Sequence, residues 1–410
     1  MKLLSFLGTT DYQEVTYTHA GAEYRTRFFP VAAARFFQPD SLHLVVTRAA
    51  YDKHFVAIKE EVGDAIDVVP VNIPEGRSED EIWDIFDALT GHLHDGDEVV
   101  LDITYGFRSL PMLAIIAAAY LRVAKQVTFR HLIYGAFEVQ DAVGRRPVFD
   151  LSPFLTLMEW TSATDLFLKT GNAGDLVAQL HAAHSLPYRR SAEHGPDEAL
   201  PQQLQRVASS IGAVSTAMRL VRPHETMTAT VGLDEKLAAV RPEAQQWAKP
   251  FGVLLDRTQA AYRPFALPEP LADVEQNLHN QLALIHWYLD RDQVVQAVTL
   301  AREWVVSLAC VRRNLPLIDG RQEAEELLGK GLNALRAGRP LPAALLATPT
   351  LEPVVRAWSQ IQDLRNDVAH CGMRAAPRPT NKIIAGIKLL AQSLDSLAET
   401  LSEDGTPTQT

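Results

Sequence analysis

The sequence predicts an α/β domain with a Rossmann-like parallel sheet, followed by an all-α region. Up to residue 150, short runs rich in valine, isoleucine and leucine alternate with amphipathic stretches of helical period. This alternation is typical of βαβ units, whose parallel strands are covered by helices on both faces. After residue 150 the short runs disappear, and the helical period continues almost to the end of the chain.

The expected elements of the first region follow from these periods. Strands are expected at Leu3–Leu7, Leu42–Thr47, Ile66–Val71, Glu98–Ile103 and Val127–Tyr134. Helices between them include Glu79–His92 and Leu110–Val123. Two polar hairpins read as insertions, Glu14–Arg27 with a turn at Ala20-Gly21 and Phe137–Phe149 with a turn at Val143-Gly144. The usual strand order 3-2-1-4-5 places the first and fourth strands side by side.

The second region contains helical patterns separated by loops rich in proline, glycine and charge. Helices are expected near Phe154–Lys169, Asp175–His184, Gln203–Leu220 and Leu233–Ala248, and in a block from Asp273 to Glu403 that breaks at Arg336–Leu351. The expected loops are His194–Pro201 and Arg222–Thr230, and the polar tail Ser402–Thr410 is expected to be disordered.

The composition fits a globular protein with two or three cores. The chain has 410 residues, of which 47% are hydrophobic, and a net charge of −11. That charge argues against a general nucleic-acid coat protein, so an RNA or nucleotide site must be a local basic patch. Cys310 and Cys371 give no disulfide framework, which suits a reducing compartment. The apolar runs Met1–Leu7 and Leu113–Tyr120 are too short for a signal peptide and a membrane span, so we expect a cytoplasmic protein with no membrane partner.

The polar loops after the first and fourth strands predict a ligand site. Ligands of doubly wound sheets bind beyond the carboxyl ends of the strands, where helices leave on opposite faces. The loops contain Gly8, Thr9, Thr10 and Asp11 after the first strand, and Thr104, Tyr105, Gly106, Phe107, Arg108 and Ser109 after the fourth.

The second of these loops carries groups that suit an anion. Gly106 allows close backbone approach, Ser109 can cap the next helix, and Pro111 suits its first turn. The N–H groups at that helix start and the Arg108 guanidinium are both suited to a phosphate. From these residues alone, an ordinary βα turn with a surface arginine is an equal alternative. Neither loop has the G-x-G-x-x-G or Walker pattern, which argues against a dinucleotide cofactor or an NTPase.

The hexapeptide Arg365-Asn366-Asp367-Val368-Ala369-His370 combines groups suited to RNA cleavage without a metal. When a ribose 2′-hydroxyl attacks its own phosphate, a histidine can transfer the proton and an arginine can stabilise the developing charge. From the hexapeptide alone, an arginine that snorkels beside a structural histidine remains open.

Helical angles place the hexapeptide at the end of an amphipathic helix. At about 100° per residue, Arg365 falls inside an apolar stripe, where it needs a partner, and Asn366 stacks with His370 on the opposite side. The stripe consists of Val354, Trp358, Ile361, Leu364 and Val368. Arg365 and His370 diverge by about 140°, so they converge only if the helix frays or a second subunit contributes. Cys371-Gly372 is the expected helix stop.

Together these segments resemble the CARF–HEPN ribonucleases that accompany type III CRISPR systems. The segment from Leu101 to Pro111 is similar to the D-x-T-x-G-x-R-x-x-P segment of CARF sensor domains. The hexapeptide resembles the R-x4-6-H signature of HEPN ribonucleases, and Ala297–Trp304 resembles their first long helix. Phe6–Thr10 and Glu159–Thr161 also lie at positions where that family has similar short motifs.

The resemblance implies a CARF sensor domain over residues 1–152, a helical connector over 153–272 and a HEPN bundle over 273–410. CARF domains bind cyclic oligoadenylate, so cyclic tetra- or hexa-adenylate would bind on the axis of a homodimer or a higher even oligomer. Thr47, Arg48 and Asn72, after the second and third strands, would line the rim, although each also reads as a solvated loop residue. The ring is an allosteric ligand, and no cofactor or metal is implied.

The resemblance also implies the activity. His370 would transfer the proton in cleavage of single-stranded RNA, Arg365 would stabilise the pentacovalent phosphate, and Asn366 would orient either group. The products would carry a 2′,3′-cyclic phosphate and a 5′-hydroxyl. Two other classes remain open: a regulator that senses the ring without catalysis, and a ring nuclease that cleaves the ring in the CARF site.

Three further groups of residues have two interpretations each. Glu303 would pair with Arg365, or be a solvated or purely structural glutamate. Arg312-Arg313 would hold RNA phosphate, or form a solvated helix end. His92 and His94 suggest a metal corner, but no further ligand follows at zinc spacing, so we expect both to be structural or solvated.

Overall fold

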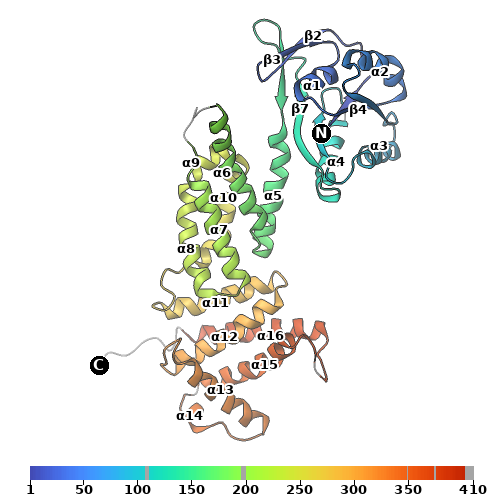
Figure 1. Cartoon of the computed structure of the whole chain (residues 1–410). Coiled ribbons are helices and arrows are strands. Elements are labelled where there is room, and N and C mark those ends of the chain that lie inside the picture. The colour runs from blue at the N-terminus through green and yellow to red at the C-terminus, as the bar shows by residue number, and fades with distance from the viewer. Residues whose placement is uncertain (107–109, 195–199, 349, 374, 402–410) are drawn as a thin grey trace. The chain divides into compact units, whose positions relative to one another are not determined.

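The computed structural model describes residues 1–106, 110–194, 200–348, 350–373 and 375–401. The chain splits into two compact units, Met1–Glu159 and Trp160–Thr410, which are described in turn (Figure 1). The predicted disordered tail Ser402–Thr410 and much of the predicted loop His194–Pro201 lie outside the described residues.

The first unit contains an eight-stranded sheet with the order β3-β2-β8-β7-β6-β1-β4-β5. The five predicted strands are all present, and their order is the predicted 3-2-1-4-5 when it is read from β5 to β7. They pair in parallel as β5-β4-β1-β6-β7. Their bounds are Lys2–Leu7 for β1, Ser41–Val46 for β4, Asp67–Asn72 for β5, Glu98–Asp102 for β6 and Thr128–Gly135 for β7. The predicted fold class is therefore confirmed.

One predicted hairpin is confirmed and the other needs correction. Strands β2 (Val15–His19) and β3 (Ala22–Thr26) are antiparallel, and their turn places Ala20 and Gly21 at positive φ, as a two-residue hairpin requires. The second hairpin is formed by β7 and β8 (Arg146–Asp150), so the predicted arm that begins at Phe137 is wrong. That stretch is a loop because Asp141 folds it locally, with Oδ1 accepting the N–H groups of Val143 and Arg145.

Helices cover both faces of the sheet. Helices α1 (Phe29–Phe37) and α2 (Arg48–Val62) pack with Leu3 in one core, while α3 (Glu79–His92) and α4 (Leu110–Ala124) pack with Leu4 in the other. Adjacent residues of β1 thus point to opposite faces, as in any strand. Of these helices, α3 and α4 match the prediction to within one residue, whereas α1 and α2 were not identified from the sequence.

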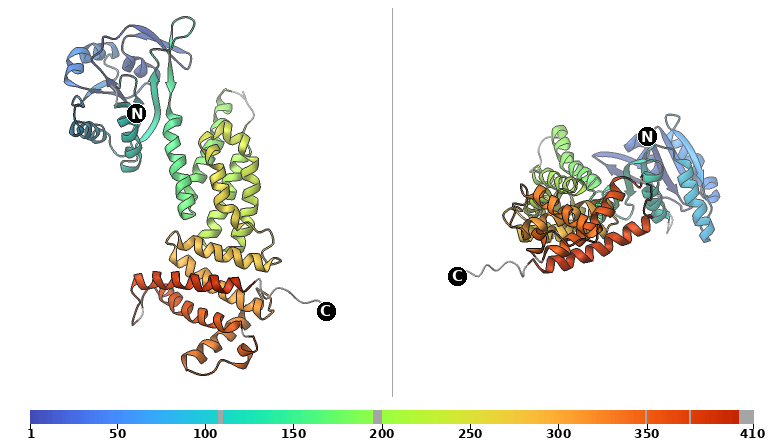
Figure 2. Two further views of the ribbon diagram at one scale, coloured as in Figure 1. Left: turned by 180° about the vertical axis from the view of Figure 1, so that it is seen from behind. Right: turned by 90° about the horizontal axis from the view of Figure 1, so that it is seen from below.

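The second unit is helical throughout the part that the structure describes. Helix α5 (Ser152–Thr170) begins in the first unit and ends in the second. The other elements are α6 (Gly174–His194), α7 (Gln203–Arg219), α8 (Pro223–Ala239), α9 (Arg241–Trp247), α10 (Lys249–Tyr262), η1 (Arg263–Phe265), α11 (Val274–Leu289), α12 (Val294–Arg312), α13 (Arg321–Arg336), α14 (Ala343–Leu346), α15 (Leu351–Ala369) and α16 (Thr380–Glu399). Helices α15 and α16, drawn in orange-red and red, pack against one another (Figure 2).

The predicted loop Arg222–Thr230 is wrong, because α8 begins at Pro223. Proline suits the first turn of a helix, where its missing N–H is not needed. Threonines of this stretch are accommodated inside the helix. The hydroxyls of Thr226 and Thr230 donate to carbonyl oxygens one turn earlier, at 2.9 and 2.7 Å.

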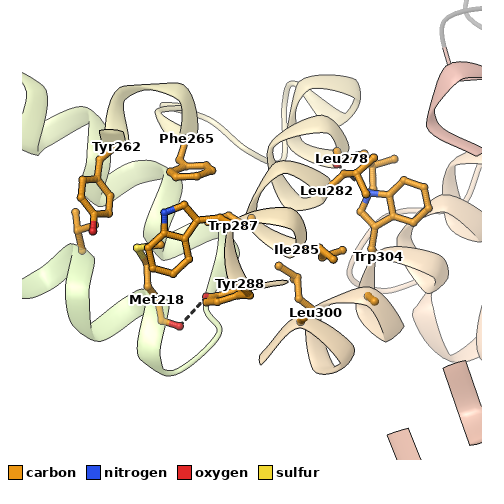
Figure 3. Packing of buried hydrophobic residues seen from close by; sticks show 14 of the residues in the cluster. Met218, Tyr262, Phe265, Leu278, Leu282, Ile285, Trp287, Tyr288, Leu300 and Trp304 are labelled. Carbon is orange, nitrogen blue, oxygen red and sulfur yellow. Dashed lines mark hydrogen bonds between the residues drawn. The ribbon is translucent and has the colours of Figure 1, made fainter. Parts of the chain in front are cut away.

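A single hydrophobic core extends from Trp160 to Leu401. Figure 3 shows part of it, where the hydroxyl of Tyr288 donates to the carbonyl oxygen of Met218 at 2.7 Å. Trp304 donates its indole N–H to the Leu278 carbonyl at 2.8 Å. These bonds satisfy the polar atoms of large buried aromatic side chains, which would otherwise destabilise the core.

Helix α12 lies at the centre of this core. By length and composition alone it is apolar enough to cross a membrane, a feature that the sequence reading overlooked. In the structure 61% of its apolar window is buried among the other residues, and a core helix passes the same test. This finding is weak evidence for a membrane span, and the expected lack of a membrane partner stays a prediction.

Candidate functional site

The predicted sensor residues lie at one edge of the sheet. Leu7, Val46 and Asn72 share a rung of β1, β4 and β5, so the loops that follow these strands leave from the same edge. Thr104 follows β6, whose Asp102 pairs with Ser5 of β1. The loops after the first and fourth predicted strands are therefore neighbours, as the predicted strand order required.

The candidate residues at this edge differ in their exposure. Thr9, Thr10, Asp11, Arg48 and Asn72 are exposed, whereas Gly8, Thr47, Thr104, Tyr105 and Gly106 are half-buried. Phe107, Arg108 and Ser109 lie outside the described residues. The Thr47 hydroxyl caps α2 by accepting the Ala50 N–H at 3.4 Å, and the exposed Arg48 pairs with Asp52 at 2.9 Å.

A pair of stacked tyrosines joins the two sensor loops. The ring centroids of Tyr12 and Tyr105 are 4.1 Å apart, and the Tyr12 hydroxyl accepts the Gly8 N–H at 2.9 Å. The Tyr105 hydroxyl donates to the Arg27 carbonyl at 3.2 Å and accepts the Phe29 N–H at 3.3 Å. Burial raises the pKa of Tyr12 to about 12, so this hydroxyl stays protonated at neutral pH.

Helix α2 holds the first loop from the other side. Lys53 Nζ donates to the Thr9 carbonyl at 2.7 Å and pairs with the Asp11 carboxylate at 2.6 Å. His54 Nε2 lies 3.0 Å from the Thr10 carbonyl. Burial lowers the pKa of His54, which favours a neutral ring whose Nε2–H donates to that carbonyl.

A buried aspartate fixes the second loop. Asp102 is fully buried at the end of β6, accepts the Ser5 hydroxyl proton and accepts the Thr104 N–H at 2.8 Å. Burial raises the pKa of Asp102 to about 6. Thr104 in turn accepts the Gly135 N–H at 2.7 Å. This chain of bonds connects β1, β6 and β7 directly beneath the loop.

Gly106 is required by packing within the second loop. A Cβ at this position would lie 2.8 Å from the Cγ atom of Pro111 and 3.2 Å from the Ile103 carbonyl. The proline at the start of α4 can therefore approach the loop only because residue 106 has no side chain.

The hexapeptide lies at the C-terminal end of α15. The helix is regular through Ala369, and His370 is its C-cap. Cys371 and Gly372 have positive φ, and the Gly372 N–H donates to the Asp367 carbonyl at 3.1 Å, so the predicted helix stop is confirmed. Because the helix does not fray before its end, Arg365 and His370 still diverge by about 140° within one chain.

The predicted placement of Arg365 in the apolar stripe is wrong. Arg365 and His370 are exposed, Asn366 is half-buried, and Asp367 is buried instead. The stripe leaves the core in the last turn, where Val368 is only partly buried, so the long arginine reaches solvent. Among the described residues, neither the Arg365 nor the His370 side chain has a hydrogen-bond or ion-pair partner.

Two predicted partners of this region are found elsewhere. Glu303 pairs with Arg302 and Arg321 and not with Arg365, so that prediction is wrong. Arg312 is not a solvated helix end, because its guanidinium donates to the Thr350 and Leu397 carbonyls. It lines a hollow of about 510 Å³ beside the first half of α15, at the other end of the helix from His370.

No cluster of three or more potential metal ligands occurs among the described residues. His92, which suggested a metal corner, lies with its Nε2 atom 2.5 Å from Nδ1 of His43. Burial lowers the pKa of His43 to about 4, so the pair is neutral near pH 7. His92 therefore has a histidine partner in the structure, and the expectation that it binds no metal stays a prediction.

The anchors of the first sensor loop were missed from the sequence. Tyr12 directly follows Asp11 but was not singled out, whereas Lys53 and His54 lie on α2, a helix that was not identified. Its apolar face was the available signal, because Tyr51, Phe55, Ile58 and Val62 recur at helical spacing.

Comparisons with known proteins match both parts of the chain. Residues 2–138 match the model of the CARF domain of the CRISPR system endoribonuclease Csx1, and residues 156–264 match that of the second domain of the CRISPR-associated protein MJ1674. The chain is 38% identical to MJ1674 of Methanocaldococcus jannaschii over 104 residues, which are 25% of this chain and only 16% of that protein.

A solved structure also aligns with nearly the whole chain. Enterococcus italicus Csm6 bound to cyclic hexa-2′-fluoro-hexa-dAMP covers 99% of this chain and 95% of its own, with 12% identity and a TM-score of 0.43. So loose a likeness does not bear on the ligand or the chemistry. The two family matches are to domains of CRISPR-associated proteins: the first part of this chain is similar to the CARF domain of Csx1, and the helical part that follows is similar to the second domain of MJ1674.

Proposed function

We propose that this protein is an endoribonuclease that cyclic oligoadenylate activates. The observation that carries the proposal is the Csx1-type CARF domain at residues 2–138, combined with an exposed arginine and histidine at the end of α15. The CARF domain would be the sensor, the region 153–272 the connector and the region 273–410 the HEPN nuclease. We place the protein in the cytoplasm, where an exposed thiol such as that of Cys371 stays reduced.

The sensor edge suits a ring of adenylates. Exposed hydroxyls of Thr9 and Thr10 and the exposed side chain of Asn72 are available to phosphate and base edges, and the tyrosine stack keeps the loops in place before the ligand arrives. Arg108 would supply the cation for a phosphate at the start of α4. Cyclic tetra- or hexa-adenylate would act as an allosteric ligand, without being consumed.

The nuclease chemistry would come from three residues of the hexapeptide. His370 would take the proton from the 2′-hydroxyl or give one to the leaving 5′-oxygen, and Arg365 would stabilise the negative charge on the pentacovalent phosphate. Asn366, half-buried beside them, would orient His370 or the phosphate. The O2′–P bond would form as the P–O5′ bond breaks, so one fragment would end in a 2′,3′-cyclic phosphate and the other, once its 5′-oxygen is protonated, in a 5′-hydroxyl.

Two copies of the chain would build each active site. Arg365 and His370 point away from each other on a regular helix, so a second hexapeptide is the remaining route to a convergent cleft.

An apolar surface on the sensor domain supports the dimer. Met112, Ile116, Tyr120 and Val123 of α4 are all exposed, and side chains spaced by three or four residues share one face of a helix.

An RNA-cleavage assay tests the proposal directly. The full chain is incubated with labelled single-stranded RNA and with cyclic tetra-adenylate, cyclic hexa-adenylate or a linear oligoadenylate as control. We expect one cyclic ligand to activate cleavage, with activity unchanged in EDTA, since histidine and arginine perform the chemistry. Loss of activity in EDTA that magnesium or manganese restores would contradict this mechanism.

The same assay separates the alternatives. Degradation of the cyclic ligand without RNA cleavage would identify a ring nuclease. Binding of the ligand with neither reaction would identify a regulator that only senses it.

A further inference from the structure

The loop that follows His370 is attached at both ends to one buried carboxylate residue. Asp367 is 1% exposed. Its carbonyl oxygen accepts the Gly372 N–H at 3.1 Å, and its side-chain Oδ2 accepts the Arg378 N–H at 3.0 Å. A single residue inside the hexapeptide therefore fixes the start and the end of the connection between α15 and α16.

A second, outer contact reinforces this attachment. The Arg378 guanidinium lies 3.3 Å from Oδ2 of Asp363, whose other oxygen is 2.9 Å from the Arg336 guanidinium at the end of α13. These side chains are about half exposed, so solvent screens both pairs and each stabilises the loop only weakly. The bond from Asp367 is partly shielded from water because its acceptor side chain is buried, which makes it the stronger of the two anchors.

The orientation of His370 depends on this loop. Its backbone N–H donates to the Asn366 carbonyl at 3.1 Å, and its carbonyl accepts the Met373 N–H at 2.8 Å. Its side chain is exposed and has no partner among the described residues. The direction of the imidazole is therefore set by the backbone at the helix end. That backbone is held by the bond from the Gly372 N–H to the Asp367 carbonyl and by the bond from the Met373 N–H to the His370 carbonyl.

We infer that Asp367 is a positioning residue of the proposed ribonuclease site: it fastens the loop after His370 and so sets where the imidazole points. The inference rests on the proposed function and adds a residue to it. Asp367 does not contact the RNA, since its carboxylate is buried and faces Arg378. A displacement of about 1 Å in a catalytic group can cost about 100-fold in rate, so a loosened loop should be seen in kcat.

Steady-state RNA cleavage by two substitutions of Asp367 tests the inference. In Asp367→Ala, which removes the acceptor for the Arg378 N–H, we expect kcat to fall by about 10- to 100-fold. The KM for RNA and the Kd for the cyclic activator should stay within about threefold. In Asp367→Asn the amide oxygen can still accept that N–H, so kcat should stay within about threefold of the wild type.

A second variant loosens the loop without touching the carboxylate. Gly372 has φ of +70°, a conformation that is strained for alanine, so Gly372→Ala should lower kcat in the same way. As a matched control, Asp395→Ala removes an exposed carboxylate of α16 that pairs with His286 at 2.7 Å, and it should leave kcat unchanged. The thermal midpoint of each variant shows whether it is folded.

The outcomes are distinct. Wild-type kcat in a folded Asp367→Ala protein, or an Asp367→Asn protein as slow as Asp367→Ala, would overturn the inference. If Asp367→Ala does not fold, rescue by Asp367→Asn and a kcat loss in Gly372→Ala carry the test. A wild type that cleaves no RNA with any cyclic ligand would remove the proposed function together with this inference.

Discussion

The ring of Tyr12 stacks on the ring of Tyr105, with centroids 4.1 Å apart and planes inclined by 28°. One tyrosine follows the loop after β1 and the other lies in the loop after β6, so the contact joins the two segments that the sequence predicted to flank the ligand. Preformed contacts of this kind lower the ordering cost of binding.

Removal of this stack should weaken binding of the cyclic activator. Tyr12→Ala deletes an aromatic contact of about 0.5–1.5 kcal/mol and the acceptor of the Gly8 N–H, so we expect the Kd to rise about tenfold. Tyr12→Phe keeps the ring and should cost about threefold. Isothermal titration calorimetry measures both, with Tyr188→Ala in α6 as a control that removes a ring elsewhere. Equal Kd values for wild type and Tyr12→Ala would show that the stack does not organise the site.

Arg108 should be needed for sensing. The residue lies outside the described part of the chain, and its role remains a prediction from the motif. Arg108→Ala should remove a charge-assisted bond of about 1.5–3 kcal/mol from each half of a two-fold site, so we expect binding to weaken tens-fold or more. Because coupling is reciprocal, the activator concentration needed for RNA cleavage should rise in parallel.

Calorimetry beside a dose–response curve of RNA cleavage tests the Arg108 prediction. Arg130→Ala, which removes an exposed guanidinium paired with Glu98 at the opposite edge of the sheet, is the control. Two Arg108→Ala curves that overlay those of the wild type would make this residue a surface arginine.

His370 should be essential for cleavage and dispensable for sensing. Loss of a general acid–base group costs roughly 10²–10⁴ in rate, so His370→Ala should reduce RNA cleavage to background. Calorimetric affinity for the cyclic ligand should change by no more than about threefold, since the hexapeptide lies in the second unit. The adjacent exposed thiol offers a control, because Cys371→Ser should retain activity. Persistent turnover by His370→Ala would move the active site elsewhere.

Asp102 should make the protein less stable as the pH rises from 5 to 7.5. The folded-state pKa of this carboxyl is about 6, above its unfolded value of 3.8, so the folded state keeps the proton longer. Raising the pH through this window therefore lowers the free energy of unfolding. Asp102→Asn stays neutral, and its stability relative to the wild type should increase by about 1 kcal/mol between pH 5 and 7.5.

Denaturant unfolding of both proteins at the two pH values checks the Asp102 prediction. The difference between variant and wild type is the relevant quantity, because His43 acts in the opposite direction. Burial lowers the pKa of His43 to about 4, below its unfolded-state pKa of 6.5. The stability that neutral His43 contributes is therefore lost as the pH falls below 6.5. A difference between the two proteins that does not change with pH would contradict the raised pKa of Asp102.

The sequence predicted the sheet well because the signals are local. Buried parallel strands such as Leu42–Thr47 are continuous apolar runs, and the polar loops follow them directly. The strand order and the positions of these loops therefore predict which edge of the sheet carries the ligand site. The order itself was an assumption drawn from common topology, and the structure confirmed it.

Side-chain partners could not be predicted in the same way. Lys53 and His54 each bind a loop carbonyl 44 residues earlier in the chain. No local sequence pattern predicts such a pairing. Arg365 was expected in the core because helical angles assume that the neighbours continue to the helix end. In the structure the last turns of α15 bury Leu364 and Asp367 and leave Arg365 exposed. The roles of Arg365, Asn366 and His370 stay predictions.

The unbroken core of residues 160–401 bears on how this half of the protein can be dissected. The Tyr288 hydroxyl donates to the Met218 carbonyl at 2.7 Å, and a Cβ on Gly171 would lie 2.8 Å from the ring of Trp287, so elements on both sides of residue 272 interlock. Such a unit should melt in one cooperative transition. Severing the chain near residue 272 would expose matching apolar faces on two fragments, which would aggregate instead of yielding a working nuclease and a separate spacer.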